Sequence, residues 1–192
     1  MKKVVLLIAS FLFILPVAVF AEDTSMYSVF KLEAYSFDLK TNSYQLEQYG
    51  SSVYVSNGLL YTNAHVVLDI YDEPLNNYRA CKTIDFKKQP ECFSVAKLLY
   101  YDTSNDLAVL KISDPKVMTA SLYHGDLEIG QKVKVYGYPG NGGETITYTE
   151  GSISGYEEGL YKIDATIDAG SSGGGVFDES GRLIGISVAV KI

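Results

Sequence analysis

Two neighbouring serines stand among glycines near the end of the chain, in the segment Gly170-Ser171-Ser172-Gly173-Gly174. A serine hydroxyl attacks a carbonyl only when a base takes its proton and donors stabilise the oxyanion that forms. Glycines permit a tight turn that directs several N–H groups toward one point. The segment therefore predicts Ser172 as a nucleophile, with the N–H groups of Gly170 and Ser172 as an oxyanion hole. A solvent-exposed hairpin loop is the alternative interpretation.

A base for this serine must come from the two histidines of the chain. His65 is the candidate because it follows an apolar strand and begins a short helical turn, in Thr62-Asn63-Ala64-His65-Val66-Val67. His124 lies in a polar loop, and we interpret it as a surface residue. A carboxylate must then orient the imidazole and stabilise its charged form. Asp106 is the candidate because it directly precedes the apolar segment 107–110, although alone it would be interpreted as a strand-end cap.

Together, the segments around these three residues resemble the catalytic blocks of trypsin-like serine proteases, in that family's order of His, Asp and Ser. The bacterial Deg-type branch is the most similar, because residues 130–140 resemble the opening of its second barrel and residues 181–186 its closing strand. The resemblance covers residues 50–190, and it includes no PDZ domain of the kind that many Deg-type proteases carry.

The resemblance implies a serine endopeptidase that cleaves protein or peptide substrates through an acyl-enzyme, with His65, Asp106 and Ser172 as its triad. It implies no metal and no organic cofactor. The alternative is a secreted, protease-like binding or adhesion module that has lost turnover, and the presence of all three triad residues favours the enzyme.

An all-β fold is expected from both the resemblance and the strand pattern. The resemblance implies two six-stranded antiparallel β-barrels with the active site in the cleft between them. One continuous sandwich is the alternative interpretation of the many short strands. A short helical turn is expected at 64–69. Segments rich in β-branched and aromatic residues predict strands at 29–37, 44–49, 52–55, 59–62, 95–100, 107–112, 132–138, 144–148, 151–154, 160–165 and 183–190.

The predicted domain organisation begins with a signal peptide at 1–21. Lys2 and Lys3 precede the apolar segment 4–17, and Val19-Phe20-Ala21 is typical of a cleavage site. We expect cleavage near Ala21 and a secreted protein, extracellular or periplasmic, without stable membrane insertion; an uncleaved anchor is the alternative. The barrels are expected at 22–113 and 114–192, since the strand pattern stops at a polar segment that contains proline. The formal net charge of −7 argues against nucleic acid as a partner.

The resemblance also assigns a substrate pocket. Its base would lie near Thr166, and its wall would comprise Ser187, Val188, Ala189 and Val190. A neutral base and an apolar wall indicate small or aliphatic side chains next to the scissile bond. Asp168 would change this preference if its carboxylate turned into the pocket.

Two cysteines, Cys81 and Cys92, are the only ones in the chain. Because export exposes them to an oxidising environment, we expect a disulfide between them. Two unpaired thiols are the alternative.

Overall fold

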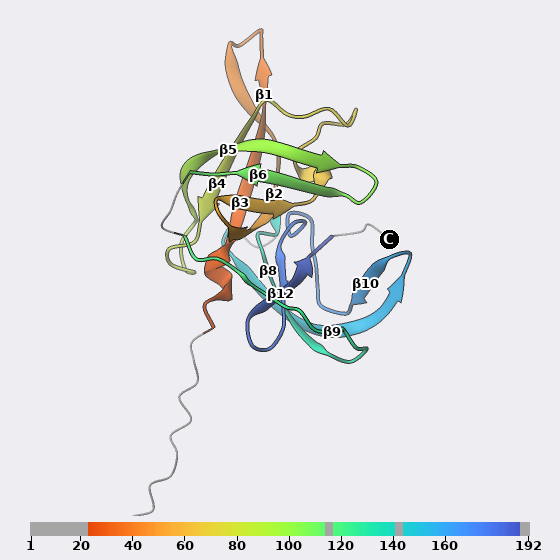
Figure 1. Ribbon diagram of the computed structural model, residues 1–192. Coiled ribbons are helices and arrows are strands. Elements are labelled where there is room, and N and C mark those ends of the chain that lie inside the picture. The colour runs from red at the N-terminus through yellow and green to blue at the C-terminus, as the bar shows by residue number, and fades with distance from the viewer. Residues whose placement is uncertain (1–22, 114–116, 141–143, 189–192) are drawn as a thin grey trace, which may run out of the picture.

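The computed structural model describes residues 23–113, 117–140 and 144–188, which form two β-sheet lobes joined side by side (Figure 1). Two 3₁₀ turns, η1 (Ser25–Ser28) and η2 (Ala64–Val66), accompany the strands. The strands are β1 (Val29–Asp38), β2 (Ser43–Ser56), β3 (Leu59–Thr62), β4 (Asn77–Lys82), β5 (Glu91–Asp102), β6 (Leu107–Lys111), β7 (Ser121–Leu122), β8 (Lys132–Gly137), β9 (Thr147–Glu157), β10 (Leu160–Ile163), β11 (Gly175–Phe177) and β12 (Arg182–Ile186). No helix in these ranges has the length and apolar character needed to cross a membrane.

The first lobe is a closed antiparallel barrel with the strand order β1-β2-β3-β6-β5-β4. Successive side chains of a strand point to opposite faces, and β1 buries both of its faces. Phe30 and Leu32 lie in the barrel core, whereas Val29 lies in a second core with Tyr138 and Phe177 of the other lobe. Because both faces are covered, the first six residues of β1 are all buried.

The second lobe is a six-stranded sheet with the order β10-β9-β8-β11-β12-β7. Val133 and Val135 of β8 lie in a core cluster of their own lobe, while Tyr136, on the opposite face, lies in the core shared with the first lobe. The predicted all-β fold is therefore confirmed, and the first lobe is the expected closed six-stranded antiparallel barrel. The second lobe has the expected six strands, but as a sheet in which β7 and β12 pair in parallel. The sheets divide between β6 and β7, where the predicted boundary at 113–116 falls mostly outside the described residues.

The structure corrects several predicted strands. Segments 44–49 and 52–55 form one strand, β2. Segment 151–154 lies within β9, whereas only the last two residues of segment 144–148 belong to that strand. The sequence analysis did not predict β4, β7 or β11. The predicted helical turn is the short η2.

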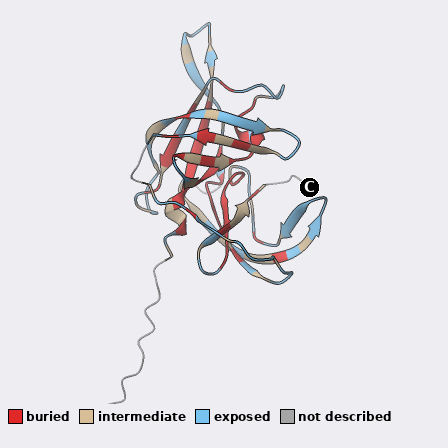
Figure 2. Cartoon of the chain, viewed as in Figure 1, coloured by how far each residue is buried: buried red, intermediate tan, exposed pale blue. Residues whose placement is uncertain are grey.

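Exposed residues concentrate at two hairpins (Figure 2). The β1–β2 hairpin extends beyond the barrel, and its turn carries Leu39, which is 86% exposed. The β9–β10 hairpin carries the exposed Tyr156 and Tyr161, whose rings contact each other edge to face with centroids 5.0 Å apart. The outer ends of these hairpins therefore contribute little to the cores.

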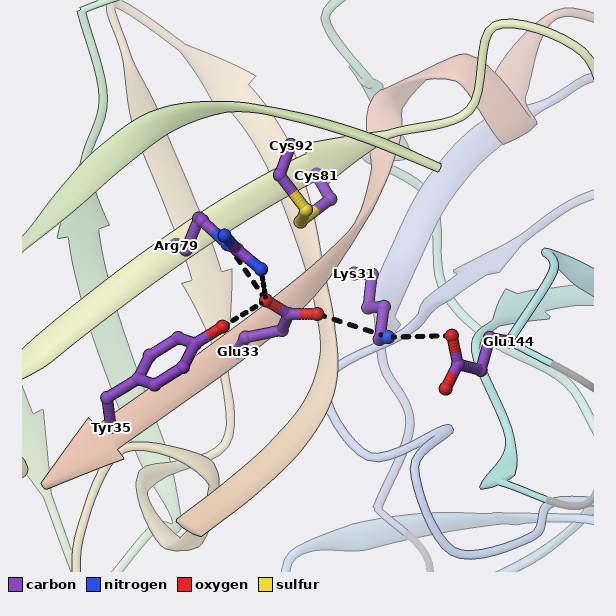
Figure 3. Close-up of a disulfide and its surroundings, with 7 residues drawn as sticks. All are labelled: Lys31, Glu33, Tyr35, Arg79, Cys81, Cys92 and Glu144. Carbon is purple, nitrogen blue, oxygen red and sulfur yellow. Dashed lines mark hydrogen bonds and ion pairs between the residues drawn. A yellow bond between two sulfur atoms is a disulfide. The ribbon is translucent and has the colours of Figure 1, made fainter. Parts of the chain in front are cut away.

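A buried ionic cluster lies on the outer face of β1, beside the Cys81–Cys92 disulfide that joins β4 to β5 (Figure 3). Glu33 is 6% exposed and accepts hydrogen bonds from Tyr35 at 2.6 Å and from Arg79 Nη2 at 2.7 Å. Its other oxygen lies 3.2 Å from Nζ of the buried Lys31. The disulfide is the pairing expected from the sequence.

The ionisation of Glu33 makes folding sensitive to acid. Burial alone would raise the pKa of Glu33, but hydrogen bonds from Tyr35, Arg79 and Lys31 together outweigh burial and lower it. The same contact acts in the opposite sense on the phenol, since burial and the Glu33 carboxylate raise the pKa of Tyr35 to about 12. The pKa of Glu33 is lower in the folded state than in the unfolded chain, where it is about 4.3. The ionised carboxylate therefore stabilises the folded state at pH values above about 4.3. This contribution is lost as the pH falls through the folded-state pKa.

We predict that Glu33→Gln lowers the free energy of unfolding at pH 7 by about 3 kcal/mol, because it removes the nearer charged partner of the buried Lys31 and leaves the longer, 3.8 Å contact with the exposed Glu144. The difference from wild type should shrink as the pH is lowered from 5 to 2.5, measured by urea denaturation at each pH. Glu157→Gln is the matched control, since Glu157 pairs with Lys162 at the surface and should contribute little. Equal effects of the two substitutions at pH 7 would contradict this account.

Candidate active site

His65 and Asp106 contact each other at two points at one end of the first barrel, where β3 ends beside the beginning of β6. The imidazole Nδ1 lies 2.8 Å from Oδ2 of Asp106, and the backbone N–H of His65 donates to Oδ1 at 3.0 Å. One carboxylate thus fixes both the ring and the backbone of η2. With Nδ1 bonded to a carboxylate, Nε2 is the ring nitrogen available for proton transfer.

The backbone of Asp106 is held in a conformation that few residue types adopt. Asp106 ends the turn between β5 and β6 with φ of 48°, in the left-handed region that Asp and Asn tolerate better than most other residues. Its carbonyl accepts a hydrogen bond from the Asn63 side-chain amide at 3.0 Å. Asn63 directly precedes η2, so the same short segment that carries the histidine also fixes the position of the aspartate.

Two glycines shape the segment that carries Ser172. Gly170 and Gly173 have φ angles of +96° and +83°, which L side chains rarely adopt. Ser172 between them is 5% exposed. The sequence pattern therefore corresponds to a tight, buried turn and not to a solvent-exposed hairpin loop.

Hydrogen bonds fix the two peptide groups expected to form the oxyanion hole. The carbonyl of Ala169 accepts from the Gly140 N–H at 2.8 Å. The carbonyl of Ser171 accepts from the Gly174 N–H and from the Ser187 hydroxyl, both at 2.8 Å. In a trans peptide the N–H points opposite to the carbonyl, so these bonds set the directions of the Gly170 and Ser172 N–H groups.

The segment carrying Ser172 packs directly against the first barrel. The Ser51 N–H of β2 donates to the Ser172 carbonyl at 2.8 Å. A Cβ atom at Gly50 would lie 2.7 Å from Cγ1 of Val66 and 3.1 Å from the Ser172 carbonyl oxygen. Ser172 and the η2 turn that bears His65 therefore contact the same glycine.

Of the residues predicted to form the substrate pocket, Thr166 lines a small pocket together with Asp168 and Ser171. Ser187 is buried, and its N–H and carbonyl are bonded to Gly174 and Gly173, so it supports the turn that carries Ser172. Val188 is half-buried. The predicted wall residues Ala189 and Val190 lie outside the described residues.

The described ranges contain one group of side chains that are close enough to hold a metal ion, namely Glu33, Cys81 and Cys92. Both sulfurs are joined in the disulfide and are not available as thiolate ligands. The group also lies on β1, β4 and β5, apart from the η2 turn that bears His65.

Sequence reasoning missed the supporting roles of Asn63 and Ser51. Asn63 belongs to the histidine motif, but its position directly before a helical turn indicates an N-cap, and its side chain makes no cap hydrogen bond and instead donates to Asp106. Ser51 lies between two segments predicted as separate strands, and nothing in its local pattern distinguishes it from a surface serine.

Known proteins share this architecture, which matches the chymotrypsin-like two-barrel fold. The chain belongs to the family of the trypsin-like peptidase domain, whose match covers residues 50–186. The solved structure of the serine endoprotease from Yersinia pestis superimposes with a TM-score of 0.68 and 29% identity, over 84% of this chain and 53% of that chain.

Two curated relatives are described as probable periplasmic serine endoproteases, DegP-like. The protein from Rhizobium meliloti is 31% identical over 150 residues, which are 73% of this chain and 28% of that protein. The protein from Brucella suis is 38% identical over 104 residues, which are 50% of this chain and 20% of that protein. The aligned part of the chain thus spans little more than a quarter of these relatives at most.

We predict that Gly173→Ala destabilises the protein far more than Gly159→Ala. The two glycines have φ of +83° and +87°, so the backbone strain is similar, about 1–2 kcal/mol. A Cβ atom at Gly173 would also lie 2.1 Å from the Ser51 carbonyl oxygen, whereas nothing lies within 4 Å at Gly159. Thermal denaturation of both variants tests the contact, and equal melting temperatures would show that the two lobes are not in backbone contact there.

Proposed function

We propose that the protein is a serine endopeptidase in which Ser172 is the nucleophile, His65 the general base and Asp106 the residue that orients His65. The observation that carries this proposal is the two-point contact between His65 and Asp106, because it prepares Nε2 to accept a proton. Membership of the trypsin-like peptidase family supports it.

In the proposed reaction, Ser172 Oγ bonds to a peptide carbonyl carbon while its proton passes to His65 Nε2. The resulting oxyanion accepts hydrogen bonds from the N–H groups of Gly170 and Ser172, and the carboxylate of Asp106 stabilises the imidazolium. The C–N bond then breaks, and His65 gives its proton to the leaving amine. Water, deprotonated by His65, finally hydrolyses the acyl-enzyme and restores the serine.

The proposed substrates are protein or peptide chains outside the cytoplasm. The lysine-flanked apolar segment at the N-terminus supports export, with cleavage near Ala21, and the relatives described as periplasmic agree with that location. The small pocket beside Ser171 is lined by Asp168 as well as by Thr166, so the pocket does not by itself support the expected preference for uncharged side chains.

A fluorophosphonate probe tests the proposed nucleophile against the alternative of an inactive binding module. We predict covalent labelling of the folded wild-type protein and no labelling of Ser172→Ala, because the probe reacts only with an activated serine. Intact-mass spectrometry measures the adduct. Ser171→Ala is the control and should still be labelled; a folded wild-type protein without any adduct would contradict the proposed activity.

A double-mutant cycle tests whether His65 and Ser172 act as one unit. His65→Ala and Ser172→Ala should each lower kcat by about 10⁴–10⁶-fold, and the double variant should lose little more, as in other serine proteases. Hydrolysis of a casein-derived fluorogenic substrate measures the rates. Losses that multiply would indicate that the two residues act independently.

A further inference from the structure

Ser51 on β2 is fully buried and takes part in four hydrogen bonds with three other parts of the chain. Its N–H donates to the Ser172 carbonyl at 2.8 Å, and its hydroxyl donates to the Gly170 carbonyl at 2.8 Å. The hydroxyl oxygen accepts from the Tyr138 N–H at 2.9 Å, and the Ser51 carbonyl accepts from the Thr62 hydroxyl at 2.6 Å. One residue of the first barrel therefore contacts the turn Gly170–Gly174, which we call the nucleophile segment, at two points.

The hydroxyl of Ser51 has a defined orientation. A serine hydroxyl has one proton, and the Tyr138 N–H occupies a lone pair of its oxygen. The proton is therefore directed at the Gly170 carbonyl. This bond fixes the peptide that follows Gly170, whereas the bond from the Ser51 N–H fixes the peptide that follows Ser172.

These two bonds complete the support of the nucleophile segment. The carbonyls of Ala169 and Ser171 accept hydrogen bonds from donors of the second lobe, and those of Gly170 and Ser172 accept hydrogen bonds from Ser51. All four consecutive carbonyls are thus fixed. Their peptide planes include both N–H groups that the proposed function uses as the oxyanion hole.

The bond from Thr62 extends this support toward His65. Thr62 ends β3 three residues before His65, and its hydroxyl is bonded to the Ser51 carbonyl. Ser51 is therefore tied both to the strand that leads into the base and to the turn that carries the nucleophile.

We infer that Ser51 is a positioning residue, whose hydroxyl holds the Gly170–Ser172 turn in the geometry that stabilises the oxyanion. The inference rests on the proposed function and adds to it a residue in the first barrel that acts on the oxyanion hole. Ser51 acts through Gly170 and Ser172, and it does not contact the substrate.

Ser52 provides a matched control. It is the next residue of β2 and is equally buried, but its hydroxyl has no hydrogen-bond partner among the described residues. Because alternate residues of a strand point to opposite faces, Ser51 faces the second lobe with Val53, and Ser52 faces the barrel core with Tyr54. Each Ser→Ala change removes one buried hydroxyl, and only one of these hydroxyls is bonded to the nucleophile segment.

The experiment compares wild type, Ser51→Ala and Ser52→Ala in the mature protein. We expect Ser51→Ala to lower kcat and the rate of fluorophosphonate labelling by about 10–100-fold, the scale of a misplaced catalytic group. KM and the midpoint of the pH–rate profile should stay unchanged, because the His65–Asp106 contact is intact. Ser52→Ala should retain wild-type rates. Hydrogen–deuterium exchange should be faster at residues 170–173 in Ser51→Ala only.

The outcomes separate this inference from the proposed function. A wild-type protein that neither hydrolyses peptides nor reacts with the probe overturns both. If the wild-type protein is active and Ser51→Ala and Ser52→Ala have equal kcat values, only the role of Ser51 is overturned. If Ser51→Ala does not fold, Ser51→Cys replaces it, since the thiol is a weak donor of similar size. We then expect a kcat about tenfold below wild type, and an unchanged kcat overturns the inference.

Discussion

The structure depends on a place where the backbones of the two lobes touch. There β2 passes the Gly170–Gly174 segment so closely that a single methyl group at Gly173 would overlap the Ser51 carbonyl. A hydrogen bond from Ser51 to the Ser172 carbonyl crosses the same contact. Contact between main chains leaves less freedom than contact between side chains, because no rotamer change can relieve it. The relative placement of the catalytic groups follows from this constraint.

Shared cores make the two lobes one folding unit. Val29 and Val53 belong to first-lobe strands, yet they pack with Tyr138 and Phe177 of the second lobe. Tyr138 also bonds through its hydroxyl to Thr83, at 2.7 Å, and is 1% exposed. Loss of packing in this shared core would therefore affect the positions of His65 and Ser172 together.

The sequence predicted the candidate site residues where a reactive side chain stands beside a residue pattern that restricts the local backbone. Glycines around Ser172 and an acid before an apolar strand were recognisable because each restricts the backbone locally. The β4 strand was missed although Tyr78 and Ala80 are buried on either side of the exposed Arg79, since the segment is short and mixed in composition. The role of Ser51 depends on residues more than 100 positions away, and only the tertiary fold brings these residues together.

The tip of the β1–β2 hairpin is held by its own local hydrogen bonds and not by packing against the two lobes. It extends away from both cores, and its turn is held locally by the Asp38 carboxylate, which accepts from the Lys40 N–H at 2.8 Å and the Thr41 hydroxyl at 3.0 Å. Lengthening a surface loop costs little conformational entropy, because the cost grows only with the logarithm of loop length. An insertion between Asp38 and Ser43 would therefore leave the catalytic centre undisturbed. The tip of this hairpin is therefore a position where the chain can accept additional residues without a change in either core.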